Sequence, residues 1–210
     1  MFMTLLASRI PQLLAARGVP YRNIDILNWP EAFPYRPEVQ FGIARTADAL
    51  LVHYRVTEDQ VLGRVGEDLG PVWTDSCVEF FCQPEGSGLY YNFECNCIGR
   101  LMVGCGEGRE GRQLALPQVL ASIDRWASLG PDPLADALGR TCWETALVIP
   151  ASAFYCHDLR SFDGIRLRAN FYKCGGTDTF KHYLSWAPID TPRPDFHRPE
   201  FFKPLSIGEF

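Results

Sequence analysis

Apolar and polar residues alternate along most of the chain with the period of two that half-buried β-strands show. The pattern predicts one hairpin from residues 39–44 and 49–56, and a second pair of strands from residues 76–82 and 89–97. Pro-Glu-Gly-Ser-Gly at residues 84–88 is a turn signal inside the second pair. Residues 99–103 are expected to continue the second pair after a bend. Further strands are expected over residues 122–129, 141–149, 165–173, 181–186 and 205–210.

Short strands separated by turn signals favour an all-β fold, and we predict a β-sandwich of two mainly antiparallel sheets with long loops. Helix is sparse. Residues 10–17 have an amphipathic pattern with Pro11 in the first turn, and 117–121 and 151–154 are short helical or turn segments. We therefore predict a helical N-terminal extension over residues 1–24 and a single β-sandwich domain over residues 25–210.

Charge and composition narrow the classes of partner. The chain has 210 residues, 47% of them apolar, and a formal net charge of −5 without any basic run. Nucleic-acid binding is disfavoured because its affinity comes mainly from Lys and Arg on phosphates. No stretch approaches the roughly 18 apolar residues of a membrane span. Arg9 and Arg17 interrupt the apolar start, so no secretory signal is recognisable. A cytoplasmic setting is expected, unless a signal has been removed. The sequence predicts no oligomeric state.

The chain has eight cysteines, but they lack the paired spacing of a structural zinc site. Cys95 and Cys97 fall on one face of a predicted strand, and no C-x-x-C pair occurs. Free cysteine is among the most buried residue types. We therefore expect reduced core thiols and disfavour zinc. The cysteines are Cys77, Cys82, Cys95, Cys97, Cys105, Cys142, Cys156 and Cys174.

Three predicted strands carry one apolar face and one face of carboxylates, amides, guanidinium groups and tyrosines. The second face holds Asp75, Cys77, Glu79 and Phe81, then Tyr90, Asn92, Glu94 and Asn96, then Arg166, Arg168, Asn170 and Tyr172. Planar bidentate groups suit the adjacent hydroxyls of a sugar. The alternative is a solvated face with cross-strand ion pairs, such as one between Glu94 and Arg168.

Two tryptophans lie at loop edges, where binding residues concentrate. Trp73 precedes a strand, and Trp186 ends one beside the proline-rich residues 188–204, which we expect to form an ordered surface loop. Aromatic faces pack on the C–H patches of sugar rings, although either side chain could instead be a core residue under a loop. The other tryptophans, Trp29, Trp126 and Trp143, are expected in the core.

Several motifs together resemble carbohydrate-binding module family 9, especially its bacterial members. They are Trp-Thr-Asp-Ser-Cys-Val-Glu-Phe-Phe at 73–81, Tyr-Tyr-Asn-Phe-Glu-Cys-Asn-Cys-Ile-Gly at 90–99, and shorter matches at 28–30, 34–37, 168–174 and 197–202. The resemblance implies a β-sandwich that binds xylan- or cellulose-type sugars between two tryptophans. It also implies structural calcium. No acidic loop of the EF-hand type is present, so no calcium ligand is assigned.

The resemblance also assigns roles to individual residues. Trp73 matches the first tryptophan, Glu79 an acidic sugar contact, Asn96 an asparagine on the adjacent strand, and Trp186 the second tryptophan. The chain departs from the family at Glu94, where the family can carry arginine. Residues 182–185 lack the asparagine that precedes the second tryptophan. With the polar strand face, the predicted ligand-binding residues are Trp73, Glu79, Glu94, Asn96, Arg168, Asn170 and Trp186.

Two other classes of function stay open. Glu79 and Glu94 face the same way on neighbouring predicted strands and could serve as the carboxylate pair of a xylanase-like glycoside hydrolase. A thiol nucleophile with His182 or His157 has no local signature to support it. A structural or interaction domain that has lost its sugar site is the third possibility. We favour non-catalytic carbohydrate binding and assign no catalytic residue.

Overall fold

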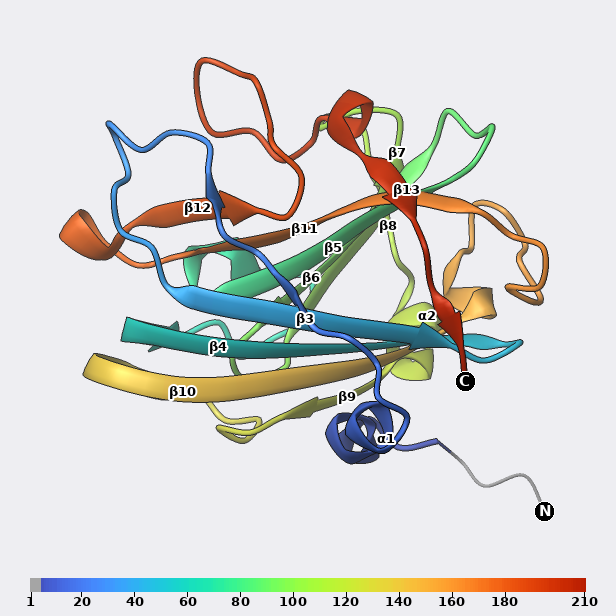
Figure 1. Ribbon diagram of the computed structural model, residues 1–210, viewed down its shortest axis with the longest axis horizontal. Helices are drawn as coiled ribbons and strands as arrows, with labels where there is room; N and C mark the ends of the chain where they lie inside the picture. Colours follow the sequence, from blue (N-terminus) through green and yellow to red (C-terminus); the bar gives the residue numbers. More distant parts are fainter. Residues whose placement is uncertain (1–4) are drawn as a thin grey trace.

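The chain folds into two stacked antiparallel sheets, which confirms the predicted all-β sandwich (Figure 1). The computed structural model describes residues 5–210, so residues 1–4 of the predicted extension lie outside it. The first sheet has the order β1-β3-β4-β10-β9, with β14 parallel to β3. Its strands are β1 (Arg22–Asn23), β3 (Glu38–Arg45), β4 (Ala49–Gly63), β9 (Asp124–Ala127), β10 (Leu134–Pro150) and β14 (Gly208–Glu209).

The second sheet has the order β2-β12-β11-β5-β6-β7-β8, with β13 paired to β11. Its strands are β2 (Ile26–Leu27), β5 (Cys77–Pro84), β6 (Tyr90–Asn96), β7 (Leu101–Gly106), β8 (Gln113–Leu114), β11 (Leu167–Gly175), β12 (His182–Ser185) and β13 (Lys203–Leu205). The strands β5, β6 and β11, which carry the predicted polar face, are therefore consecutive in space as β11-β5-β6.

Short helices flank the two sheets. The α-helices are α1 (Ile10–Ala16) and α2 (Pro117–Ser122), and the 3-10 helices are η1 (Ala7–Arg9), η2 (Val72–Thr74), η3 (Ala151–Ala153), η4 (Asp178–Phe180) and η5 (Pro199–Phe201). Ile10 and Leu14 of α1 pack on the outer face of the first sheet, where they meet Leu51 and Ala146. None of the helices in residues 5–210 is long and apolar enough to cross a membrane.

Two predicted strands differ from the structure. Residues 99–103 do not prolong β6: the chain reverses at Gly99, where φ is 81°, and β7 pairs antiparallel with β6. Glycine adopts this left-handed conformation without steric cost. The predicted strand over residues 205–210 is divided, since β13 joins one sheet and β14 the other. Neither change is visible in the alternation of side chains.

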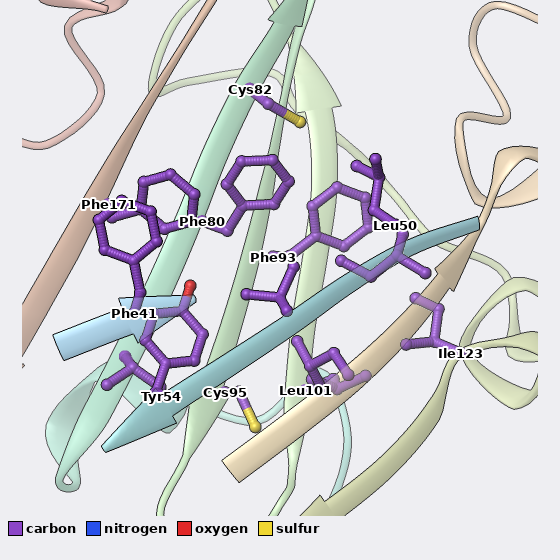
Figure 2. Close-up of a cluster of buried hydrophobic side chains, with 14 of the residues drawn as sticks. Phe41, Leu50, Tyr54, Phe80, Cys82, Phe93, Cys95, Leu101, Ile123 and Phe171 are labelled. Atoms are coloured by element: carbon purple, nitrogen blue, oxygen red, sulfur yellow. The ribbon is translucent and has the colours of Figure 1, made fainter. Parts of the chain in front are cut away.

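Aromatic rings fill the space between the sheets (Figure 2). Phe41 of the first sheet stacks on Phe171 of the second with ring centroids 3.6 Å apart, and Phe80 lies 4.8 Å from Phe171. Cys82 and Cys95 lie in the same cluster. All eight cysteines are free thiols and six are buried, as expected of core thiols. The expectation is wrong for Cys142, which is exposed, and Cys156 is only partly buried.

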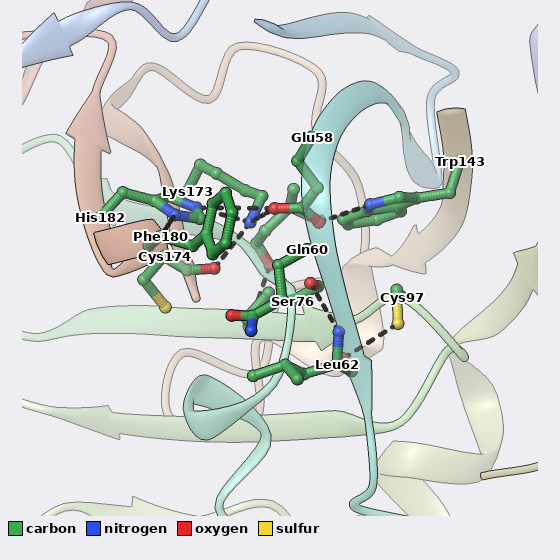
Figure 3. Close-up of polar contacts among 12 residues, drawn as sticks. Glu58, Gln60, Leu62, Ser76, Cys97, Trp143, Lys173, Cys174, Phe180 and His182 are labelled. Atoms are coloured by element: carbon green, nitrogen blue, oxygen red, sulfur yellow. Dashed lines mark hydrogen bonds and ion pairs between the residues drawn. The ribbon is translucent and has the colours of Figure 1, made fainter. Parts of the chain in front are cut away.

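A buried polar network joins the two sheets at one end (Figure 3). The ammonium group of Lys173 on β11 lies 2.8 Å from a carboxylate oxygen of Glu58 on β4, and both side chains are fully buried. The same ammonium is 2.8 Å from Nε2 of His182 and 2.8 Å from the carbonyl oxygen of Cys174. The other Glu58 oxygen accepts a 2.7 Å hydrogen bond from the indole N–H of Trp143.

The outer face of the second sheet is covered by loops instead of solvent. Trp29, Val72, Phe81, Tyr172 and Phe196 form a second apolar cluster there, and much of its cover comes from residues 188–202. The prediction of an ordered loop in this region is therefore confirmed. Polar side chains on this face are buried, and they surround a cavity beside the cluster.

Candidate functional site

A cavity of about 500 Å³ opens on the outer face of the second sheet. Its floor comes from β5 and β6, and its walls come from η2, from the β7–β8 connection and from residues 194–197. The lining residues are Trp73, Glu79, Asn92, Glu94, Met102, Arg109, Glu110, Arg112, Leu114, Cys174, Tyr183, Pro194, Asp195, Phe196 and His197. The lining combines apolar side chains, such as Trp73, Met102 and Phe196, with convergent polar groups, and this mixture is typical of ligand sites.

Two carboxyl groups lie side by side on the floor. Glu79 and Glu94 are direct partners in the β5–β6 register, so both side chains point to the same face. They are only 3% and 4% exposed. The amide N–H of Asn92 donates to one Glu94 oxygen over 2.8 Å, and the Cys174 thiol donates to one Glu79 oxygen over 3.2 Å. The second oxygen of each carboxyl has no hydrogen-bond partner among residues 5–210.

Arg112 orients this floor but does not pair with its acids. Its Nε donates to Oδ1 of Asn92 over 2.9 Å, and its terminal nitrogens donate to the carbonyl oxygens of Tyr90, Gly104 and Gly108. A Cβ at Gly104 would lie 2.9 Å from Oδ1 of Asn92, so this close approach requires glycine. The guanidinium therefore fixes Asn92, which in turn fixes Glu94.

Burial changes the charge of the cavity groups. It raises the pKa of Glu94 to about 7, against the opposing effects of the Asn92 hydrogen bond and the positive charge of Arg112. Burial also raises the pKa of Glu79 well above its ordinary value, with a further contribution from Cys174 and Glu94. Protonated carboxyls donate as well as accept hydrogen bonds. The floor can therefore interact with hydroxyl groups in both directions.

His197 on the wall is held neutral. Burial lowers its pKa to about 3, and Arg112 contributes to the shift. Its Nδ1 forms a 2.8 Å hydrogen bond with the hydroxyl of Tyr90, and the tautomer of the ring sets which group donates. The neutral ring adds polarity to the cavity without charge.

Trp73 supplies an exposed aromatic surface at the edge of the cavity. Its side chain is 48% exposed, which is unusual for so large an apolar group in this chain. Hydrogen bonds hold in place the turn η2, which carries Trp73. Its carbonyl oxygen accepts a 3.4 Å hydrogen bond from the Cys174 thiol, and Asp75 accepts a 2.9 Å hydrogen bond from the N–H of Val65. The ring is thus exposed on a well-anchored turn.

Only three of the seven predicted site residues, Trp73, Glu79 and Glu94, line this cavity. Trp186 does not face Trp73 across it. The Trp186 ring packs against Phe41 and Phe171 of the core, with centroids 5.8 and 6.0 Å away. The two-tryptophan clamp expected from the resemblance is therefore not formed by Trp186.

The other three predicted residues have structural partners. Asn96 donates to Asp75 and to the carbonyl oxygen of Val65, Arg168 donates to the carbonyl oxygen of Phe202 over 2.7 Å, and Asn170 both donates to and accepts from the Ala187 backbone. The alternative ion pair between Glu94 and Arg168 is also wrong, because β5 lies between their strands.

Several cavity residues were missed by sequence reasoning. Asn92 carries a detectable signal, since it shares a strand face with Glu94. Arg112, Phe196 and His197 come from loops, where no periodicity indicates direction. Cys174 lies on the polar face by alternation, but its residue type suggests a core position.

A second hollow, of about 380 Å³, lies near Arg168, and charged side chains that line it already form ion pairs. Arg45 pairs with Asp163 at 2.9 Å, and Arg166 lies 3.7 Å from a carboxylate oxygen of Glu85. Unlike Glu79 and Glu94, these groups already have charged partners. We therefore place the candidate site at the cavity over β5 and β6.

The calcium implied by the resemblance does not fit the ligand group that the structure brings together. Within residues 5–210, the clustered metal-binding side chains are Cys77, Glu79 and Cys174. Calcium takes six to eight oxygen ligands, and two of these three groups are thiols. This set is therefore not a calcium site.

Two antiparallel sheets with an open, polar-floored cavity and an exposed aromatic edge define a β-sandwich binding module. The chain belongs to carbohydrate-binding family 9, whose family model matches residues 8–207. Among curated proteins, none matches the chain.

Solved structures agree with this assignment. A protein from Bacteroides uniformis, described as a candidate carbohydrate-binding protein, is 44% identical and has a TM-score of 0.94, over 99% of this chain and 94% of that one. A family 9 module from Caldicellulosiruptor kristjanssonii in complex with glucose is 12% identical with a TM-score of 0.58, over 92% of this chain and 86% of that one. The complex of such a module with cellotriose is 11% identical to this chain and has a TM-score of 0.56, over 92% of this chain and 85% of that one. The last two show a shared fold.

Proposed function

We propose that the chain is a non-catalytic module that binds a plant-type β-glycan, or its short oligosaccharides, through Trp73, Glu79 and Glu94. One observation carries the proposal: two carboxyls on the floor of a cavity edged by an exposed tryptophan each keep an oxygen that no group of residues 5–210 hydrogen-bonds. A sugar ring offers what this site lacks, namely adjacent hydroxyls for the floor and a C–H face for the indole. The glucose and cellotriose complexes of the Caldicellulosiruptor module support this class of ligand.

Calorimetric titration with glucose, cellobiose, cellotriose and xylotriose tests the proposal. We expect saturable binding to the wild-type protein. Trp73→Ala is expected to weaken it about tenfold, because an aromatic contact contributes roughly 1 kcal/mol beyond the area it buries. Trp186→Phe is the matched control and should keep its affinity, since Trp186 packs in the core. No heat with any sugar, or equal affinity in Trp73→Ala, would refute the proposal and favour the interaction-domain alternative.

The hydrolase alternative has one feature in its favour, which is that Glu79 and Glu94 are neighbours across the register. A glycosidase also needs one of its two carboxyls ionised as nucleophile or base. Neither residue forms an ion pair within residues 5–210, and burial raises the pKa of both carboxyls, that of Glu94 to about 7, so no cationic partner holds either group in its ionised form. We therefore propose binding without hydrolysis. Release of reducing ends from xylan by the wild-type protein, abolished in Glu79→Gln, would overturn this part of the proposal.

A further inference from the structure

Three potential metal ligands converge at the edge of the cavity floor. Cys77 and Glu79 are two positions apart on β5 and point to the same face, while Cys174 on β11 lies directly opposite Cys77. One ligand atom from each residue, two sulfurs and one carboxylate oxygen, lies within 4.8 Å of the other two. The two cysteines are far apart in sequence, so the spacing of cysteines along the chain does not reveal the group.

The separations suit a small tetrahedral ion. Zinc–sulfur bonds of about 2.3 Å and zinc–oxygen bonds of about 2.0–2.2 Å place tetrahedral ligand atoms roughly 3.5 Å apart. The Cys174 sulfur is 3.2 Å from a Glu79 oxygen, and the third atom is within 4.8 Å of both. Small side-chain rotations therefore close the set around one ion.

The position of the group leaves room for an outside ligand. Cys77 is fully buried on the same face of β5 and does not line the cavity of about 500 Å³, whereas Glu79 and Cys174 do. An ion bound by all three would have its fourth position open to the cavity. Three protein ligands with one open position characterise zinc sites that bind water or substrate.

The chemistry of the ligands selects the type of ion. Thiolates favour zinc and other soft ions, whereas calcium and magnesium require oxygen. A divalent cation would also place positive charge beside Glu79, which forms no ion pair within residues 5–210. The site therefore matches zinc in donor type, number and separation.

We propose that Cys77, Glu79 and Cys174 form a zinc site at the floor of the cavity, with its fourth coordination position facing the ligand. The ion replaces the two thiol protons and the carboxyl proton of Glu79, and no change of oxidation state is involved. The zinc site and the proposed sugar site rest on different observations, although Glu79 belongs to both. A sugar hydroxyl or a water molecule can complete the coordination.

Cobalt titration of metal-free, fully reduced protein tests the site, because Co²⁺ bound to thiolates gives near-ultraviolet charge-transfer absorption. We expect saturation at one equivalent and displacement by zinc. Cys77→Ser and Cys174→Ser should each weaken cobalt binding at least about tenfold, since loss of even an outer-shell partner costs 10- to 100-fold. Cys82→Ser is the matched control: it lies on β5 but faces the core, so the absorption should persist.

Three outcomes would overturn the zinc site: no absorption in wild-type protein with eight reduced thiols, unchanged absorption in both variants, or a Cys77–Cys174 disulfide in protein isolated without oxidant. The wild-type titration remains decisive even if a variant fails to fold. Sugar titration of the metal-free protein separates the two proposals. Sugar binding without cobalt binding removes only the zinc site, and cobalt binding without sugar binding removes only the proposed function.

Discussion

The buried ion pair between Lys173 and Glu58 provides the sharpest test of how the sandwich is held together. The pair joins β11 of one sheet to β4 of the other, and neither side chain reaches solvent. The contact is 2.8 Å, although its angle departs from that of a hydrogen bond. His182 and the Cys174 carbonyl take the remaining contacts of the ammonium group, and Trp143 donates to the other carboxylate oxygen.

Lys173→Met keeps most of the volume and removes the charge. It leaves the Glu58 carboxylate buried beside Nε2 of His182, with the Trp143 hydrogen bond as its remaining support. Removing one partner of a buried pair costs about 3–5 kcal/mol. Single domains are stable by roughly 5–15 kcal/mol, so the variant should lose a large share of its free energy of unfolding.

A double-mutant cycle with Glu58→Gln isolates the pair. Urea unfolding followed by far-ultraviolet circular dichroism gives the free energy of unfolding, and an unchanged m-value confirms that the same transition is compared. We expect each single variant to lose at least about 3 kcal/mol and the double variant to lose at least about 1 kcal/mol less than their sum. A loss below about 1 kcal/mol in Lys173→Met, or simple additivity of the two losses, would refute this account of the network.

Three further predictions concern single positions. Asn96→Ala should lower the free energy of unfolding by about 1–3 kcal/mol because its buried partners lose their hydrogen bonds, while calorimetric sugar affinity stays unchanged; a selective loss of affinity would contradict the structural role. Gly176→Ala should cost at least about 3 kcal/mol in urea unfolding, since a Cβ would lie 2.1 Å from the carbonyl oxygen of Phe180, whereas Gly164→Ala, at a similar φ with open space, should cost only about 1 kcal/mol. His197 has a folded-state pKa of about 3 against 6.5 when unfolded, so the unfolded chain binds the proton first and stability falls as pH drops below about 6.5. His197→Asn should therefore lose less stability than wild type between pH 6.5 and 4, by at most about 3 kcal/mol, and parallel pH profiles would rule this out.

The sheets were predictable because alternation reports which face of a strand meets the core. Counting by two from Phe80 or Phe93 places every inward residue of β5 and β6 correctly. The same rule, applied to β12, would have assigned Trp186 to the core, since it lies two positions after the buried Leu184. The loop context suggested exposure instead, and the strand periodicity was the better guide.

The outer face of the second sheet was harder to interpret. Alternation identifies a polar face but does not say what covers it. Asn96, Arg168 and Asn170 look like binding residues in sequence, yet the loops above the sheet supply backbone groups that need them as partners. Such pairings depend on the paths of the loops that contain Val65, Ala187 and Phe202, which no local pattern encodes.

The buried residue Glu58 differs from Glu79 and Glu94 in its partners, and this difference distinguishes a structural acidic group from candidate ligand-binding ones. Glu58 has an ammonium group and an indole N–H as partners, so its burial is matched by contacts within the chain. Glu79 and Glu94 are almost as deeply buried, yet each keeps an oxygen without a hydrogen-bond partner in the described part of the chain, while nearby Arg112 is occupied by carbonyls and Asn92. The second oxygens of Glu79 and Glu94 lie on the lining of the open cavity, whereas both oxygens of Glu58 are enclosed by the chain. These accessible carboxyl oxygens are therefore the strongest sign that the cavity takes a ligand.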